Sequence, residues 1–140
     1  SRLVNLGSFH EDIPSDDAFL MLANRRDPLG LMTPAIAYRV SDYVRRGAER
    51  TRGVMRQIAR AMGGTEITFE PGFTTNHHPA GTTIMGADPG TSVVDPDCRA
   101  HDHPVIFIAG SSVFPSISAV NPTLTIAALA LRLADHLKAG

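Results

Sequence analysis

Short apolar runs separated by turn residues recur along the chain, and each has the length of a β-strand. Residues 24–34 separate two of these runs and contain Asp27-Pro28-Leu29-Gly30, which is typical of a turn. The last run is continuously apolar, as expected of a strand buried on both faces of a sheet. The pattern therefore predicts strands at residues 3–9, 18–23, 35–40, 65–70 and 105–109.

A longer amphipathic pattern predicts a helix from Ser41 to about Met62. Its apolar side chains recur at spacings of three, four and seven residues, as one face of a helix requires. Ser41 is suited to cap the helix N-terminus, and Gly63-Gly64 is suited to end the helix. Arginines occupy its remaining sides, and we expect this basic face to be solvated unless a partner covers it.

A second helix is predicted over residues 122–138, and it is almost wholly apolar after its first turn. Asn121 is a good N-cap, and Pro122 fits the first helical position because its missing N–H costs nothing there. The hydroxyls of Thr123 and Thr125 lie in the first turn. A helix N-terminus carries roughly half a positive charge, so we expect a negative or polarisable group in front of it. A well-capped core helix without a ligand is the alternative.

Composition places the 140 residues within the range of one globular domain, because 43% are apolar and 19% are charged. The formal net charge of −1 gives no basic field that would favour nucleic acid. Cys98 is the single cysteine, which excludes an internal disulfide. No apolar run approaches the ~18 residues of a transmembrane segment. The sequence opens within a strand-like pattern and without methionine, so we expect a portion of a longer protein.

The segment between residues 71 and 104 is dense in Gly, Pro, Asp and Thr. A connection this long is usually functional or disordered. It contains Asn76-His77-His78-Pro79, in which a neutral imidazole is suited to accept a proton near pH 7. One alternative is a plain turn with one exposed and one packed histidine. The other is a metal site that also draws on His101, His103 and the nearby aspartates.

The metal alternative lacks the ligand spacing that helical zinc sites use, and adjacent histidines point apart. The aspartates have a simpler explanation. Asp88-Pro89-Gly90 and Asp95-Pro96-Asp97 are typical of turns in which the carboxylate accepts hydrogen bonds from nearby backbone N–H groups. No metal ligand is therefore assigned.

Four motifs follow one another along the second half of the chain. They are His78-Pro79-x-Gly81-Thr82-x-x-Met85-Gly86, Ser92-Val93-Val94-Asp95, residues 105–109 with Gly110-Ser111-Ser112-Val113-Phe114-Pro115, and Asn121-Pro122-Thr123-Leu124-Thr125. Their order and spacing resemble the C-terminal part of glucose–methanol–choline (GMC) oxidoreductases, and in detail they are similar to bacterial FAD-dependent sugar, gluconate and sorbitol dehydrogenases. The resemblance is specific over residues 76–138 and weak over residues 1–75.

The resemblance implies a reaction and two catalytic residues. His78 matches the family's catalytic histidine, which accepts the proton of an alcohol as hydride leaves the carbon for flavin N5. Asn121 matches the second active-site position, which would hydrogen-bond the substrate oxygen. The implied substrates are small molecules with a CH–OH group, namely sugars, polyols or sugar acids.

The resemblance also implies FAD as the cofactor. The helix N-terminus would favour negative charge on the flavin ring without a nearby lysine or arginine. The positions expected near the flavin are Gly110 and Ser111, in the turn that follows the last strand, and Asn121, Pro122 and Thr123, at the start of the last helix.

The implied fold is α/β, as an α+β fragment of a larger protein. Residues 1–75 would give strands and a helix of the substrate domain, residues 76–104 the active-site loop region, and residues 105–140 the strand and helix that complete the FAD-binding domain. No GxGxxG unit occurs in the sequence. The part that binds the ADP half of FAD is therefore expected from the same parent chain or from another chain.

The isolated chain is expected to be inactive and to expose apolar surface on its last strand and last helix, so that it can form homo-oligomers. Two other functions stay open. One is a catalytically silent binding or assembly module with the same scaffold, and the other is a metal-dependent enzyme using the histidine-rich loop. The sequence leaves the substrate, the electron acceptor, the mode of FAD attachment and the compartment open.

Overall fold

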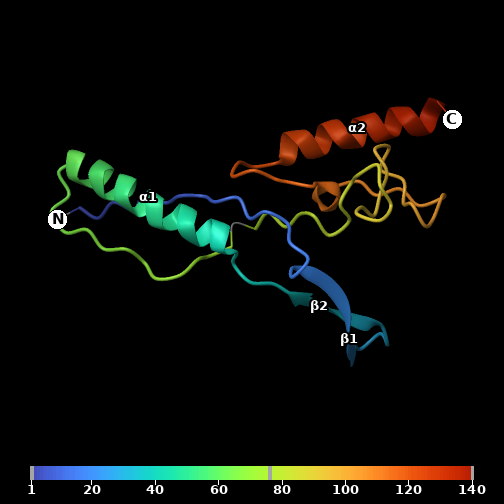
Figure 1. Cartoon of the computed structure of the whole chain (residues 1–140), viewed down its shortest axis with the longest axis horizontal. Coiled ribbons are helices and arrows are strands. Elements are labelled where there is room, and N and C mark those ends of the chain that lie inside the picture. Colours follow the sequence, from blue (N-terminus) through green and yellow to red (C-terminus); the bar gives the residue numbers. More distant parts are fainter. Residues whose placement is uncertain (1, 76, 140) are drawn as a thin grey trace. The chain divides into compact units, whose positions relative to one another are not determined.

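The computed structural model describes residues 2–75 and 77–139. Within them the chain forms a mixed α/β fragment, as predicted (Figure 1). It divides into two compact units, Ser1–Ile13 with Val40–His77 and Pro14–Arg39 with His78–Gly140. The elements are β1 (Phe19–Arg26), β2 (Met32–Ala37), α1 (Asp42–Ala61), the 3₁₀ turn η1 (Ser111–Val113) and α2 (Thr123–Ala139).

The first unit is built around α1, which agrees with the predicted helix to within about a residue at each end. The Ser41 hydroxyl accepts a hydrogen bond from the Val44 N–H at 3.3 Å and donates to the Asp12 carboxylate at 2.6 Å. The helix ends where Gly63 adopts a φ of 84°, and the Gly63 and Gly64 N–H groups bind the last helical carbonyls. Local capping therefore fixes both ends of this element.

The basic face of α1 is partly covered by aromatic rings rather than wholly solvated. The Arg45 guanidinium lies 6.0 Å from the centre of the Phe73 ring. Arg52 and Arg56 lie 5.8 and 5.1 Å from the centre of the Phe69 ring. Such cation–π contacts are each worth roughly 0.5–1 kcal/mol at exposed sites. They hold the segment after α1 beside the helix, although residues 65–70 form no strand, contrary to the prediction.

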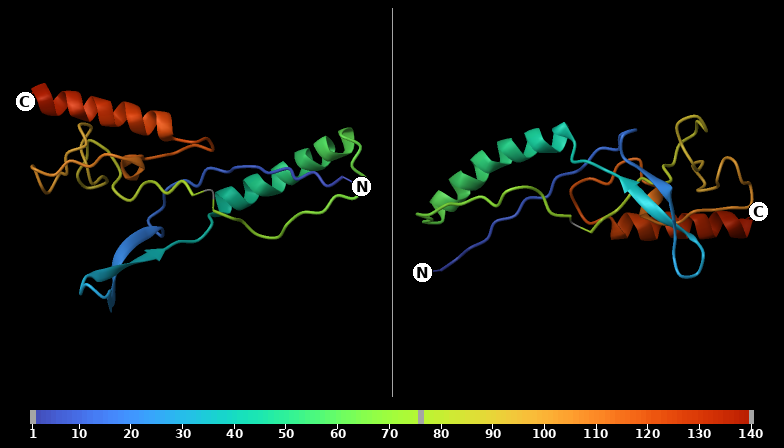
Figure 2. Two further views of the ribbon diagram at one scale, coloured as in Figure 1. Left: turned by 180° about the vertical axis from the view of Figure 1, so that it is seen from behind. Right: turned by 90° about the horizontal axis from the view of Figure 1, so that it is seen from below.

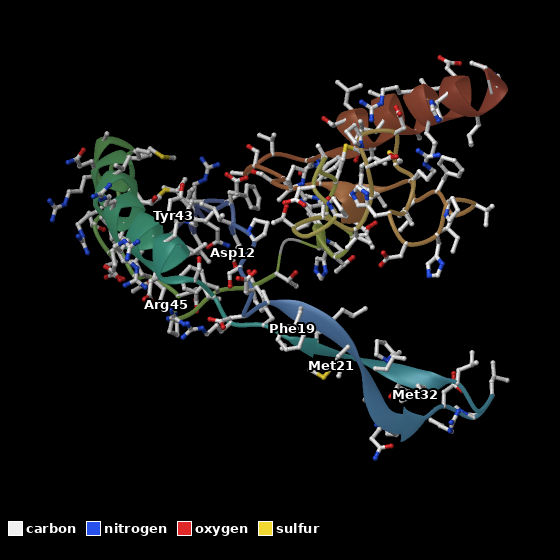
Figure 3. The ribbon with its side chains drawn as sticks, turned by 45° about the vertical axis from the view of Figure 1, so that its right-hand side comes forward. Asp12, Phe19, Met21, Met32, Tyr43 and Arg45 are labelled. Atoms are coloured by element: carbon white, nitrogen blue, oxygen red, sulfur yellow. The ribbon has the colours of Figure 1, made fainter. Side chains whose placement is uncertain are left out.

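The second unit contains the antiparallel hairpin of β1 and β2, in which Phe19 pairs with Ala37. The hairpin confirms the second and third predicted strands, but both extend further into the expected turn. The remaining turn is closed by the Asp27 carboxylate, which accepts from the Leu29 and Leu31 N–H groups at 2.9 Å each. Figure 3 shows large apolar side chains along both strands, and these are exposed: Phe19, Met21 and Met32.

Two other predicted strands are wrong. Residues 3–9 have no strand structure, and their large apolar side chains are exposed. Residues 105–109 form only a single bridge, between Phe107 and Arg99. A strand that is apolar on both faces normally lies inside a sheet whose two faces are both covered. Among the described residues, the backbone of 105–109 is instead held from one side, by the bonds between Ile106 and Ala100 and between Ile108 and Cys98.

The core of the second unit lies between α2 and the irregular segment before it. Figures 1 and 2 show α2 lying along this segment. Val94 and Val113 are fully buried, with 0 and 1% of their surface exposed, and Phe114 joins them. Around these three pack Ala80, Met85, Ile108, Ile117, Ile126 and Leu129. Part of the long connection, including Ala80, Met85 and Val94, therefore packs into the core of this unit.

The opposite side of α2 is open. Leu124 and Leu131 are 84% and 68% exposed, whereas Leu133 is buried. Leu124 and Leu131 are seven residues apart and so lie on one face of the helix. The expected apolar surface on this helix is therefore present. Within the described part of the chain, neither helix is long and apolar enough to cross a membrane.

Candidate functional site

His78 begins a segment that is hydrogen-bonded to the η1 turn. The N–H groups of Gly81, Thr83 and Met85 donate to the carbonyls of residues 111, 112 and 113 at 3.3, 2.9 and 2.9 Å. In addition, the Ser111 hydroxyl donates to the Pro79 carbonyl at 2.7 Å. Two motifs more than thirty residues apart in sequence are thereby brought together, with the half-buried His78 at the start of the paired segment.

His77 and His78 differ in their surroundings. His77 is exposed, has a φ of 57°, and donates its N–H to the Thr75 hydroxyl at 3.1 Å. His78 is half-buried and belongs to the second unit. These surroundings match the simpler alternative given above, a turn with one exposed and one packed histidine. Asn76, the first residue of the expected active-site region, lies outside the described residues.

The turn before η1 depends on glycine. Gly110 has φ 128° and ψ −174°, a backbone region that is essentially restricted to glycine. Apart from Gly110 and its two neighbours in the chain, no atom of the described residues lies within 4 Å of the position where a Cβ would stand. The backbone here is therefore open to close approach by another group, which is the property that a cofactor-binding turn needs.

The start of α2 lines a cleft of about 380 Å³. Its walls are the segment from Phe114 to Ser118 and the residues Val120, Asn121, Pro122, Thr125 and Leu129. Of these lining residues, Asn121 is exposed and Pro122 is buried. The first N–H groups of a helix have no partner within the helix. The cleft thus combines apolar walls with polar donors at a helix N-terminus, as small-molecule sites commonly do.

The cap of α2 differs from the prediction by one residue. The Ile126 N–H donates to the Pro122 carbonyl at 2.9 Å, and the helix begins at Thr123. The N-cap is the residue whose carbonyl accepts the first helical bond, so Pro122 holds this position rather than Asn121. Asn121 lies one residue before the cap, so its side chain does not stand at the N-cap position.

Six site positions were expected from the sequence, and all lie in the second unit. His78, Gly110 and Ser111 lie on the two segments that are joined by the bonds between the loop and η1. Asn121 and Pro122 line the cleft, whereas Thr123 is not among its lining residues. Thr125, noted only for its first-turn hydroxyl, also lines the cleft. The expected positions are His78, Gly110, Ser111, Asn121, Pro122 and Thr123.

The two aspartate turns are as predicted. The Asp88 carboxylate accepts from the Gly90 N–H at 2.9 Å. The Asp95 carboxylate accepts from the Asp97 and Arg99 N–H groups at 2.8 and 3.0 Å, and it contacts the Arg99 guanidinium at 3.3 Å. Burial alone would raise the pKa of Asp95, but these bonds and the positive charge of Arg99 outweigh it and lower the pKa below 3.8.

His101 is part of a structural network that the sequence did not reveal. Its Nε2 lies 2.9 Å from the Ser92 hydroxyl and 3.2 Å from the Gly86 carbonyl. Ser92 also donates to the Asp88 carbonyl at 2.6 Å. The network holds the turn between residues 86 and 92. Among the described residues, no group of three or more His, Cys, Asp or Glu side chains is arranged to hold a metal ion.

Comparison with known proteins identifies the family. A family profile described as GMC oxidoreductase matches residues 14–130. The fructose dehydrogenase large subunit of Gluconobacter japonicus is 45% identical over 133 residues, which are 94% of this chain and 24% of that protein. A C-glycoside 3-oxidase of Microbacterium trichothecenolyticum is 32% identical over 139 residues, 96% of this chain and 27% of that protein.

A solved structure has the same fold. The crystal structure of pyridoxine 4-oxidase from Mesorbium loti matches 81% of this chain and 26% of that chain, with a TM-score of 0.65 and 23% identity. The chain spans about a quarter of the length of these relatives. The chain belongs to the GMC oxidoreductase family and corresponds to the C-terminal portion of its members.

Proposed function

We propose that this chain is the C-terminal, substrate-facing portion of an FAD-dependent oxidoreductase that oxidises a CH–OH group. The proposed substrate is a sugar, polyol or sugar acid. The names of two relatives, a fructose dehydrogenase subunit and a C-glycoside 3-oxidase, support this substrate class. The observation that carries the proposal is the hydrogen bonding of the His78 segment to the η1 turn, which gathers a potential base and a glycine-dependent turn in one unit.

The residues present fit a flavin at the start of α2. The cleft there is lined by apolar side chains, and the helix N-terminus adds unpaired N–H donors and a partial positive charge. The Gly110 backbone is open to close approach. In the proposal Gly110, Ser111, Asn121, Pro122 and Thr123 hold the cofactor. FAD, when bound, supplies the acceptor for the electrons that leave the alcohol carbon.

His78 is the proposed base in this reaction. A neutral imidazole accepts the proton of the substrate hydroxyl, and such a base typically contributes 10²–10⁴-fold to the rate. Pro79 restricts the backbone of the residue before it, so His78 starts from a confined geometry. Asn121 lies on the cleft, where its amide can hydrogen-bond the substrate oxygen and orient it for reaction.

The flavin-binding remainder is proposed to come from the same parent chain or from a second chain. We call this chain together with that remainder the assembled enzyme. Within it, residues 1–75 would contribute to the substrate domain, residues 76–104 to the active site, and residues 105–140 to the flavin domain. The exposed apolar hairpin and the open face of α2 support this arrangement, because both would be covered by further chain.

The test is anaerobic reduction of the bound flavin in the assembled enzyme by a panel of sugars, polyols and sugar acids. The expected result is bleaching of the flavin by at least one member, with formation of the corresponding carbonyl product or lactone. A flavin that is bound but reduced by no member would favour the silent binding module. Activity that depends on a stoichiometric metal ion would favour the metal-dependent enzyme.

A further inference from the structure

We propose that the Ser111 hydroxyl is a positioning group for His78. This inference rests on the proposed function, because it assigns Ser111 a role through the proposed base. The hydroxyl of Ser111 donates to the carbonyl of Pro79, the residue directly after His78, at 2.7 Å. The bond joins two segments that are 32 residues apart in sequence.

Ser111 holds the His78 segment at two points. Its side chain binds the Pro79 carbonyl, and its own carbonyl accepts the Gly81 N–H at 3.3 Å. These contacts bracket Ala80 and fix the chain on both sides of it. The contacts that follow, from Thr83 and Met85, continue the pairing away from the histidine. Ser111 is therefore at the end of the pairing where His78 lies.

The backbone around Pro79 transmits this restraint to the imidazole. The proline ring fixes φ of Pro79 and keeps His78 out of the helical region. Gly81 is held at a φ of 78°, which a residue with a side chain rarely adopts. Rotation about ψ of Pro79 sets the direction of the Pro79 carbonyl. The bond from Ser111 fixes that direction.

This role differs from direct binding of the flavin by the Ser111 side chain. A serine hydroxyl has one proton to donate, and that proton is used on the Pro79 carbonyl. The backbone of Gly110 and Ser111 is left to approach the cofactor. The two roles therefore predict different consequences when only the hydroxyl is removed.

The experiment compares three variants of the assembled enzyme, Ser111→Ala, Ser111→Thr and Ser112→Ala. Small displacements of a reacting group can cost up to about a hundredfold in rate. We expect Ser111→Ala to lower kcat by roughly ten- to a hundredfold, with KM and flavin content unchanged. Ser111→Thr keeps the hydroxyl and should restore most of the rate. Ser112→Ala removes the hydroxyl of the neighbouring residue and preserves the backbone bonds, so this variant should have the unmodified rate.

A double-mutant cycle with His78→Ala gives the second readout. If Ser111 acts through His78, adding Ser111→Ala to His78→Ala should not lower the residual rate further. Loss of flavin from Ser111→Ala would overturn the positioning role in favour of cofactor binding. A full rate in Ser111→Ala would overturn this inference alone. A full rate in His78→Ala would overturn the proposed function together with it.

Discussion

Replacing Val94 with alanine should loosen the segment that carries His78. Val94 is fully buried, and its backbone N–H and carbonyl bond to the Ile84 carbonyl and the Gly86 N–H. Removing two methyl groups forfeits ~1.6 kcal/mol at ~0.8 kcal/mol per buried CH₂. The remaining cavity adds to this loss because its neighbours relax only in part. We expect a total of about 2–3 kcal/mol in local stability.

Val93 provides the matched control. It is the neighbouring residue, undergoes the same chemical change to alanine, and is 46% exposed. The cost of Val93→Ala should therefore stay below ~1 kcal/mol, because much of its side chain is already in water.

Amide hydrogen exchange in the purified chain measures the difference directly, because it reports the free energy of local opening. A loss of about 2 kcal/mol corresponds to roughly thirtyfold faster exchange. We expect this acceleration at the Met85 and Gly86 amides in Val94→Ala. Equal acceleration by Val93→Ala and Val94→Ala would refute the assignment of Val94 to the core of this unit.

Three further predictions concern other parts of the chain. The pKa of Asp95 lies below 3.8, so the stability that its carboxylate gives to the turn is present above about pH 3.8 and is lost as the pH falls through the lowered pKa. Hydrogen exchange at the Arg99 amide should therefore accelerate in acid, and Asp95→Asn should weaken this pH dependence. Ser41→Ala removes the cap of α1 and should cost ~1 kcal/mol, seen as faster exchange at the Val44 amide, whereas unchanged protection there would contradict the capping role. Leu131→Glu should reduce self-association of the isolated chain in sedimentation experiments, since it places a charge on the open face of α2; an unchanged sedimentation profile would exclude this face as the contact.

The sequence predicted well the features that depend on neighbouring residues. The ends of α1 follow from the Ser41 cap and the Gly63-Gly64 pair, and both signals act within one helical turn. The turns at Asp88 and Asp95 likewise use backbone donors two to four residues away. Such interactions are encoded in short stretches and need no knowledge of the rest of the fold.

The features that depend on residues far apart in the sequence were predicted poorly. The apolar run at residues 105–109 has the composition of a buried strand, but a strand forms only where neighbours pair with it, and the described residues supply a single bridge. The contact between Ser111 and Pro79 carries no sequence signal, because any serine near a turn has the same local appearance. The resemblance named candidate residues one by one, whereas the hydrogen bonds that join their segments became visible only in the structure.

If His78 is the base of an alcohol oxidation, its removal must slow the reduction of the bound flavin in a single turnover. The assembled enzyme and its His78→Ala and His77→Ala variants would be mixed anaerobically with the best substrate of the panel, after flavin content has been matched. We expect His78→Ala to bind flavin but to reduce it ~10²–10⁴-fold more slowly, and His77→Ala to react normally. Reduction by His78→Ala at the unmodified rate would show that His78 is not the base.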